Sequence, residues 1–320
     1  MTSMLASLYK KIVLLSPYVE VLLRQMYWKN VSRLRKYRPY GKVKTVSFSR
    51  DYVDFDRVID YLRSKGIGEG ALLVVHSSYD ALECTGLTPE EIIDKLLLLI
   101  GKTGTLAMPA IRKFKGEPKL EKILSFNTDD LICTYNVKKT VLISGLLPYT
   151  LMRKENAEIS HFPLNPMVAV GPLAKEMMAG NLKGTYPSPH GANSSWKFCH
   201  DHDAFVIGLG VDLEHYNTMI HVAEEAFGDW KWPVDKWYRL RQFDIVDEQN
   251  NRSSVTVSER KPKWGMLHIA ELNLYRDLIR HKIIEKVKIE NMIPVSVERS
   301  QDLITFLRTR NNKGYPYFGK

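Results

Sequence analysis

Apolar residues recur along the chain with two periods, one typical of amphipathic helices and one typical of buried strands. Residues 51–65 place five apolar side chains on one helical stripe, namely Tyr52, Phe55, Val58, Ile59 and Leu62. This spacing predicts a helix that Gly66 is suited to end. Residues 88–91 read Thr-Pro-Glu-Glu and predict the start of a second helix, because they combine an N-cap, a first-position proline and a capping box.

Short apolar runs between polar segments predict the strands of a central sheet. Three such runs are residues 71–75, 105–109 and 204–209. Two later segments, 254–257 and 287–297, predict further strands, and helices are expected at 143–153, 172–178, 218–227 and 267–284. Strands that alternate with helices predict the α/β fold class, here a layered α/β/α sandwich around a central sheet.

Two irregular segments of the predicted sandwich are candidates for ligand binding. His76, Ser77 and Ser78 directly follow the first predicted strand, and ligands of open α/β sheets bind at the carboxyl ends of the strands. A simple strand-ending turn is the alternative. Residues 184–195 are rich in Gly, Pro, Ser and Asn, and a long irregular segment inside a compact domain is often functional.

The composition is that of a soluble globular protein without a disulfide framework. The chain has 320 residues, of which 44% are hydrophobic and 26% charged. Its three cysteines, Cys84, Cys133 and Cys199, form no CxxC pair and are expected to be inert thiols. These features favour a reducing cytoplasmic location.

The formal net charge of +10 is concentrated at the N-terminus. Residues 1–50 contain eleven Lys and Arg residues against a single acid, Glu20, which accounts for the whole excess. We therefore predict a basic, helical N-terminal extension over 1–50 and one α/β domain over 51–320. The charge informs us about the extension and not about the chemistry of the domain.

No apolar run in the extension is expected to be long enough to cross a membrane. Its uncharged run at residues 12–19 contains a proline and is far shorter than the about 20 apolar residues that a spanning helix needs. Two short amphipathic helices are predicted, at 5–15 and 18–28, followed by a basic run at 33–44. The extension could pack on the domain or on a partner subunit, or dock on the inner face of an anionic membrane. Nucleic-acid binding is not expected, because no zinc-finger or RNP-type motif occurs.

A histidine and a glutamate three residues apart form the most informative candidate site. His221 and Glu224 lie in a segment predicted to be helical, where positions i and i+3 share one face. The carboxylate could orient the imidazole, and an imidazole near neutral pH can remove a proton from an attacking amine. A histidine with a purely structural role is the alternative that spacing alone leaves open.

Other apparent motifs predict neither a metal nor a nucleotide cofactor. Residues 200–203 read His-Asp-His-Asp, but adjacent residues of an extended segment point to opposite faces, so a solvated loop is expected there. A metal-dependent hydrolase built on His200, His202 and Asp203 is the rival hypothesis. Residues 208–210 read Gly-Leu-Gly, yet Leu213 stands where a dinucleotide fingerprint needs its third glycine.

Taken in order, the motifs of the chain resemble those of the aminoglycoside 3-N-acetyltransferase family, also called the antibiotic N-acetyltransferases. They are residues 75–78 (Val-His-Ser-Ser), 101–109 (Gly-Lys-Thr-Gly-Thr-Leu-Ala-Met-Pro), 161–163 (His-Phe-Pro) with 169–171 (Ala-Val-Gly), 191–194 (Gly-Ala-Asn-Ser), 208–210 (Gly-Leu-Gly) and 218–224 (Thr-Met-Ile-His-Val-Ala-Glu). Six motifs in the family's order cover roughly residues 70–228.

The resemblance implies an acyltransferase that uses acetyl-CoA as co-substrate, without a metal. By this analogy His221 is the general base and Glu224 orients or stabilises its imidazole. Five further residues are expected to contact the CoA moiety or the oxyanion of the reaction: His76, Ser77, Ser78, Thr218 and Ser194. A homodimer is compatible with the resemblance. The scaffold alternative is a chain that binds CoA or a glycan without catalysis.

The chain departs from the family pattern where the acceptor is expected to bind. His161 is displaced by one position relative to the family's His-Pro, Pro166 replaces a serine, and Ser195 replaces a proline. Aminoglycosides are polycations that favour acidic clefts, and the charge totals do not indicate such a cleft. We therefore expect an amino-sugar acceptor on a nucleotide- or lipid-linked precursor of a surface polysaccharide, with an aminoglycoside as the alternative.

Overall fold

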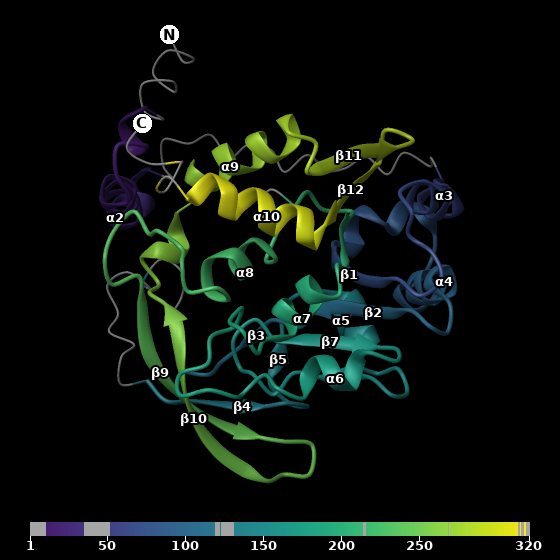
Figure 1. Ribbon diagram of the computed structural model, residues 1–320, viewed down its shortest axis with the longest axis horizontal. Coiled ribbons are helices and arrows are strands. Elements are labelled where there is room, and N and C mark those ends of the chain that lie inside the picture. Colours follow the sequence, from purple (N-terminus) through teal and green to yellow (C-terminus); the bar gives the residue numbers. More distant parts are fainter. Residues whose placement is uncertain are drawn as a thin grey trace.

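The central element of the protein is a seven-stranded mixed sheet with the strand order β11-β12-β8-β1-β2-β7-β6 (Figure 1). The computed structural model describes residues 11–34, 52–118, 122, 131–213, 216–267, 269–312, 314 and 317. The strands of the sheet are β1 (Leu72–Ser77), β2 (Thr105–Pro109), β6 (Glu158–Ile159), β7 (Met167–Val170), β8 (Phe205–Leu209), β11 (Ile284–Ile289) and β12 (Ile293–Arg299). The predicted strands at 71–75, 105–109 and 204–209 form the centre of this sheet.

The three central strands run parallel, and the flanking pairs are antiparallel. β1 lies between β2 and β8, parallel to both, whereas β12 pairs with β8 and β7 with β2 in the antiparallel sense. In this register His76 lies opposite Gly208, which lies opposite Ser296. The end of β1 and the end of β8 therefore open at the same edge, where His76, Ser77 and Ser78 are found.

Helices cover both faces of the sheet and confirm the predicted α/β/α sandwich. One face packs on α3 (Asp56–Ser64), α4 (Pro89–Ile100) and α5 (Leu146–Leu151); the other packs on α6 (Ala174–Met178), α7 (Ser195–Asp201), α8 (Ile220–Glu225), α9 (Ile269–Arg280) and α10 (Ser300–Asn311). Alternation along β1 sends Leu73 and Val75 into the first core and Leu72 and Val74 into the second. His76 continues the second series and faces α7.

A smaller β unit, which the sequence pattern did not reveal as a separate sheet, lies beside the sandwich. It consists of β9 (Tyr238–Val246), β10 (Arg252–Arg260) and β4 (Cys133–Asn136), in the order β10-β9-β4, and a short pair of β3 (Arg112–Lys113) and β5 (Val141–Leu142). β9 and β10 form a long curved hairpin that extends away from the main sheet (Figure 1). This unit has a core of its own, around Tyr135 and Phe243. The hairpin begins and ends near α8.

The described part of the N-terminal extension packs on the domain. α2 (Pro17–Leu34) contacts the short 3₁₀ turn η4 (Trp264–Met266), and Tyr18 meets Trp264 edge to face at 5.3 Å. The helix predicted at 18–28 falls within α2, whereas most of the helix at 5–15 and of the basic run at 33–44 lies outside the described residues. No helix in the described ranges is long and apolar enough to cross a bilayer. The domain boundary near residue 50 stays a prediction.

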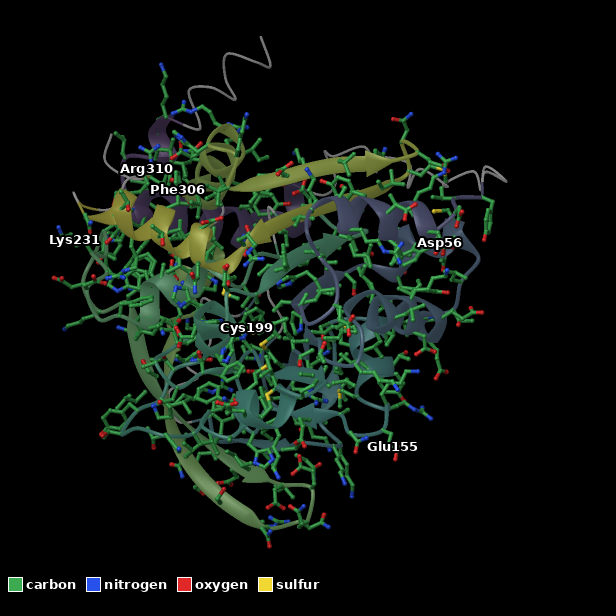
Figure 2. The ribbon with its side chains drawn as sticks, turned by 45° about the vertical axis from the view of Figure 1, so that its right-hand side comes forward. Asp56, Glu155, Cys199, Lys231, Phe306 and Arg310 are labelled. Atoms are coloured by element: carbon green, nitrogen blue, oxygen red, sulfur yellow. The ribbon has the colours of Figure 1, made fainter. Side chains whose placement is uncertain are left out.

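Two local predictions are corrected by the structure. The helix expected at 143–153 is limited to α5, because its expected first turn contains Ser144 and Gly145, and Gly145 has φ +108°. Residues 200–203 are not simply a loop, since His200 and Asp201 form the last turn of α7. α7 begins at Ser195, directly after the hydroxyl of Ser194 caps it. The helix carries Cys199 into the interior, where Figure 2 shows its side chain.

Candidate active site

α8 carries the predicted histidine and glutamate into direct contact. Nδ1 of His221 lies 2.6 Å from Oε2 of Glu224, as the spacing of three residues on a helix predicts. The side chains of His221 and Glu224 are 20% and 10% exposed, so the pair is largely withdrawn from water. The other ring nitrogen, Nε2, has no hydrogen-bond partner among the described residues, and His221 lines a cavity.

The cavity has a volume of about 760 Å³ and opens at the carboxyl edge of β1 and β8. Four of the predicted ligand-contacting residues line it together with His221: His76, Ser77, Ser78 and Thr218. Apolar side chains from α9, from the start of α5 and from the segment before it complete the wall, among them Leu274, Leu278, Leu146 and Ile143. Hydroxyl groups and apolar surface beside an imidazole suit a ligand such as pantetheine, which combines amide groups with methylene chains.

His76 contributes a neutral imidazole to this cavity. The residue is 6% exposed, and its ring stacks on Trp196 of α7 with centroids 5.9 Å apart. Burial lowers the pKa of His76 to about 3, so the ring carries no charge at neutral pH. Its Nε2 atom has no partner in the described protein, which leaves it available to a ligand or a bound water.

Ser194 is placed apart from the other predicted residues. Its hydroxyl accepts a hydrogen bond from the backbone N–H of Lys197 at 3.0 Å and so caps α7. It borders a second, smaller cavity of about 230 Å³, which is lined mainly by residues 183–194. The structure therefore brings Ser77, Ser78 and Thr218 together with His221 but gives Ser194 a capping contact elsewhere.

Arg260 is a member of the site that the sequence did not reveal. It is the last residue of β10, and its Nη2 atom lies 2.8 Å from Nδ1 of His221 and forms an ion pair with Glu224. Burial alone would raise the pKa of Glu224, but the charges of Arg260 and His221 outweigh burial and lower it. Glu224 is therefore ionised at neutral pH.

A second buried hydrogen-bond network, centred on Glu225, lies next to the His221–Glu224 pair. The carboxylate of Glu225 accepts hydrogen bonds from the backbone N–H of His190 at 2.9 Å and from the hydroxyl of Tyr238 at 3.0 Å, and it lies 3.2 Å from Nδ1 of His190. Asn165 donates to Nε2 of His190 at 3.2 Å, which leaves the ring proton on Nδ1. The His190 ring lies 5.0 Å from that of His221.

Glu298 forms a third buried acidic site, behind the wall of the cavity. It is 2% exposed, and the amide of Asn217 donates a hydrogen bond to its Oε2 atom at 3.0 Å. Burial raises the pKa of Glu298 to about 8, and the hydrogen bond from Asn217 offsets only part of this effect. The group is therefore mainly protonated at neutral pH, and Asn217 in turn lines the cavity next to Thr218.

The Gly-Leu-Gly motif serves packing at the same edge. A Cβ atom on Gly208 would lie 2.5 Å from Oγ of Ser296 and 2.6 Å from the carbonyl oxygen of Val211. Gly210 adopts φ +73°, a conformation that favours glycine. Both glycines let the chain turn tightly at the end of β8, so they shape the cavity without forming a dinucleotide loop.

The described residues contain no group of three His, Cys, Asp or Glu side chains arranged to hold a metal ion. The three side chains of the metal-dependent hydrolase hypothesis make separate contacts: His200 with Asp201, His202 with Phe198, and Asp203 with Arg299. His161, which the family resemblance singled out, contacts Glu248 at 2.9 Å on the smaller β unit and does not line the main cavity.

Comparison with known proteins gives this site a family. The sequence profile described as aminoglycoside 3-N-acetyltransferase matches residues 74–308, more than half of the chain. Aminoglycoside N(3)-acetyltransferase IV from Salmonella is 29% identical over 167 residues, which are 52% of this chain and 57% of that protein. The chain thus matches little more than half of the length of that relative.

Solved structures of similar proteins share the fold. AAC-IIIb in a binary complex with CoASH has a TM-score of 0.62 at 15% identity, and the match covers 82% of this chain and 97% of that one. A variant of AAC(3)-IVa in complex with apramycin has a TM-score of 0.60 at 20% identity, covering 82% and 94%. The profile match over most of the domain and the order of the motifs lead to one conclusion: the chain belongs to the aminoglycoside 3-N-acetyltransferase family.

Proposed function

We propose that this protein transfers the acetyl group of acetyl-CoA to an amine of an aminoglycoside. The observation that carries the proposal is the His221–Glu224 pair, in which Nδ1 of His221 is held by Glu224 while the residue lines a cavity with hydroxyl and apolar groups. A family of CoA-dependent N-acetyltransferases supports the reaction type. The hydroxyl and apolar lining of the cavity supports acetyl-CoA as the co-substrate.

In the proposed reaction the amine attacks the thioester carbonyl while both ligands are held in one complex. Nε2 of His221 removes the proton from the amine as the nitrogen–carbon bond forms, and Glu224 stabilises the resulting imidazolium. The carbonyl oxygen becomes an oxyanion, for which the hydroxyls of Ser77, Ser78 and Thr218 are the candidate donors. When the carbon–sulfur bond breaks, the imidazolium returns the proton to the departing thiolate.

An aminoglycoside now replaces the nucleotide- or lipid-linked amino sugar as the preferred acceptor. The relatives include acetyltransferases named for aminoglycosides, and one solved neighbour holds apramycin. Within the described chain, the residues that line the large cavity include two aspartates, Asp80 and Asp212, and neither lysine nor arginine. Two carboxylates in the wall favour a cationic acceptor such as an aminoglycoside. The expected surface-polysaccharide precursor has no support from the relatives.

Steady-state assays of the purified protein test this choice of acceptor. Release of the CoA thiol is measured with acetyl-CoA and gentamicin or apramycin, and in parallel with a nucleotide-linked amino sugar. We expect turnover with the aminoglycosides that is lost in His221→Gln and strongly reduced in Glu224→Gln. Turnover of the nucleotide-linked sugar alone would contradict the proposed acceptor, and no thiol release with either would contradict the enzymatic function.

We also propose that residues 1–50 contact the surface of an anionic membrane. α2 presents an exposed apolar stripe, in which Tyr18, Leu22 and Met26 are 54%, 56% and 54% exposed. The excess of basic residues in the same segment supports attraction to anionic lipids. Co-sedimentation with phosphatidylserine but not phosphatidylcholine vesicles, weakened in Leu22→Glu, is expected. Equal recovery of the protein in the supernatant with both kinds of vesicle would contradict membrane contact. Sedimentation velocity would test whether the protein is a homodimer.

A further inference from the structure

Arg260 approaches the catalytic pair from a different part of the fold than the pair itself. It lies 39 residues after His221 and ends β10, opposite Tyr238 at the start of β9. Three polar atoms therefore meet at one point: Nδ1 of His221, Oε2 of Glu224 and Nη2 of Arg260. A guanidinium is always a donor and always charged, so its place beside a general base needs a physical account.

Only one arrangement of protons lets His221 act as a base at the cavity. If Nδ1 accepted a hydrogen bond from Arg260, the ring proton would lie on Nε2, and this nitrogen could not remove a proton from the acceptor amine. If instead Nδ1–H and the guanidinium both donate to Oε2 of Glu224, Nε2 keeps its lone pair. The carboxylate oxygen is then shared between a ring N–H and a permanent cation.

A stack of aromatic rings holds Arg260 at this point. Its guanidinium lies over Trp232 at 5.8 Å, Trp232 stacks on Trp237 at 4.5 Å, and Trp237 stacks on Trp264 at 4.7 Å. Lys263 covers the far end of the stack, 4.4 Å from the Trp264 ring. The stack fixes the guanidinium against Glu224. The side chain of Arg260 is 17% exposed, so water screens its charge only weakly.

The other charged groups near His221 are accounted for by their own partners. From α8 come Glu224 and Glu225, of which Glu225 is bound by His190 and Tyr238. Burial lowers the pKa of His190, so this ring is neutral at neutral pH despite its contact with Glu225. α7 and α10 pack apolar residues such as Trp196 and Leu307 against α8. Among the residues that the structure describes, Arg260 is therefore the permanent cation that contacts the pair directly.

We propose that Arg260 is a positioning residue that lowers the pH at which His221 becomes available as a base. Without it, the full charge of Glu224 would hold a proton on the imidazole. By sharing the same carboxylate oxygen, the guanidinium weakens this hold and also keeps the ring oriented with Nε2 toward the cavity. The proposal deepens the proposed acetyl transfer and rests on His221 being its base.

The test compares the pH dependence of kcat/KM in the wild type, Arg260→Gln and Arg260→Lys. In Arg260→Gln the acid limb is expected to move up by about one pH unit, which makes the rate at the acid end about tenfold lower while the alkaline plateau stays within about twofold. Arg260→Lys keeps a charge without the planar fork and is expected to restore most of the acid limb. Lys263→Met, at the other end of the stack, is the matched control and should leave the limb unchanged.

A measurement without substrate separates this proposal from the proposed function. The imidazole C–H resonances of His221 are titrated by NMR and assigned by their loss in His221→Gln. Their midpoint should rise in Arg260→Gln even if no acceptor is ever acetylated. A midpoint and acid limb that stay in place would overturn the proposal, as would loss of folding in Arg260→Gln, because Arg260 would then serve the fold and not the base.

Discussion

Two regions next to the cavity bury glutamates at similar depth and treat them in opposite ways. On α8, Glu224 and Glu225 meet Arg260, His190 and the hydroxyl of Tyr238, and the pKa of Glu225 falls to about 2 although burial by itself would raise it. On β12, Glu298 meets a single amide, and burial raises its pKa to about 8. Partners decide the charge of a buried carboxyl group, because burial penalises the ion in both regions.

The two regions consequently respond to pH with opposite sign. Glu225 has a folded pKa below its ordinary value of 4.5, so it contributes stability that is present above that value and is lost as the pH falls toward 2. Glu298 has a folded pKa above its ordinary value of 4.5, so the folded state holds a proton that the unfolded state has released. Its contribution is most favourable below pH 4.5 and is lost as the pH rises toward 8.

The largest effect is expected from removing the imidazole that makes the α8 region functional. His221→Gln should lower kcat by about 10²- to 10⁴-fold, the usual contribution of a general base. The fold should persist, because the ring is partly exposed at the cavity. CoA binding measured by calorimetry should change little. A variant that keeps near-wild-type turnover would show that the ionised groups on α8 have a structural role and not a catalytic one.

The same substitution in the two regions should have opposite effects on stability. Glu225→Gln replaces an acceptor oxygen by an NH₂ group that faces donors from His190 and Tyr238. Since hydrogen bonds to a charged group contribute about 1.5–3 kcal/mol, urea unfolding at pH 7 should show a loss of about 2–3 kcal/mol. Unchanged stability would mean that the ionised carboxylate is not what holds His190 in place.

Glu298→Gln should instead leave stability unchanged at pH 5 and increase it at pH 8. The amide mimics the neutral acid and cannot ionise, so the cost of keeping the buried carboxyl group protonated or of burying its ion disappears. With a pKa raised from 4.5 to about 8, this cost is about 4 kcal/mol near pH 8. Thermal melts from pH 5 to 9 measure the difference between variant and wild type. If the melting temperature changes equally with pH in the variant and the wild type, the contrast between β12 and α8 is wrong.

Sequence patterns identify the elements whose signals are local. The capping box of α4, the apolar runs of β1, β2 and β8, and the spacing of His221 and Glu224 all depend on residues a few positions apart, and the structure contains each of them. The family resemblance, given by ordered motifs, adds the reaction class. It does not add the partners that set the charge of α8.

What the sequence missed depends on contacts between distant segments. Arg260 reaches His221 only because the β9–β10 hairpin returns its end to α8, and the hairpin itself carries mixed polar and apolar residues on its two faces. Glu298 reaches Asn217 across 81 positions. His190 lay within a segment expected to be functional, 184–195, but its orientation depends on Glu225 and Asn165.

The smallest effect is expected at Ser194, the predicted ligand contact that belongs to neither region. Its hydroxyl is already bound to the backbone N–H of Lys197, unlike the hydroxyls of Ser77 and Ser78 that line the large cavity. Ser194→Ala should therefore cost about 1 kcal/mol of stability through the lost N-cap and leave the KM for acetyl-CoA within about twofold. Ser77→Ala is the matched comparison, and it should raise KM or lower kcat with little loss of stability. A KM raised in Ser194→Ala at unchanged stability would place this hydroxyl at the ligand, and the boundary of the site would then extend beyond the α8 and β12 regions to the start of α7.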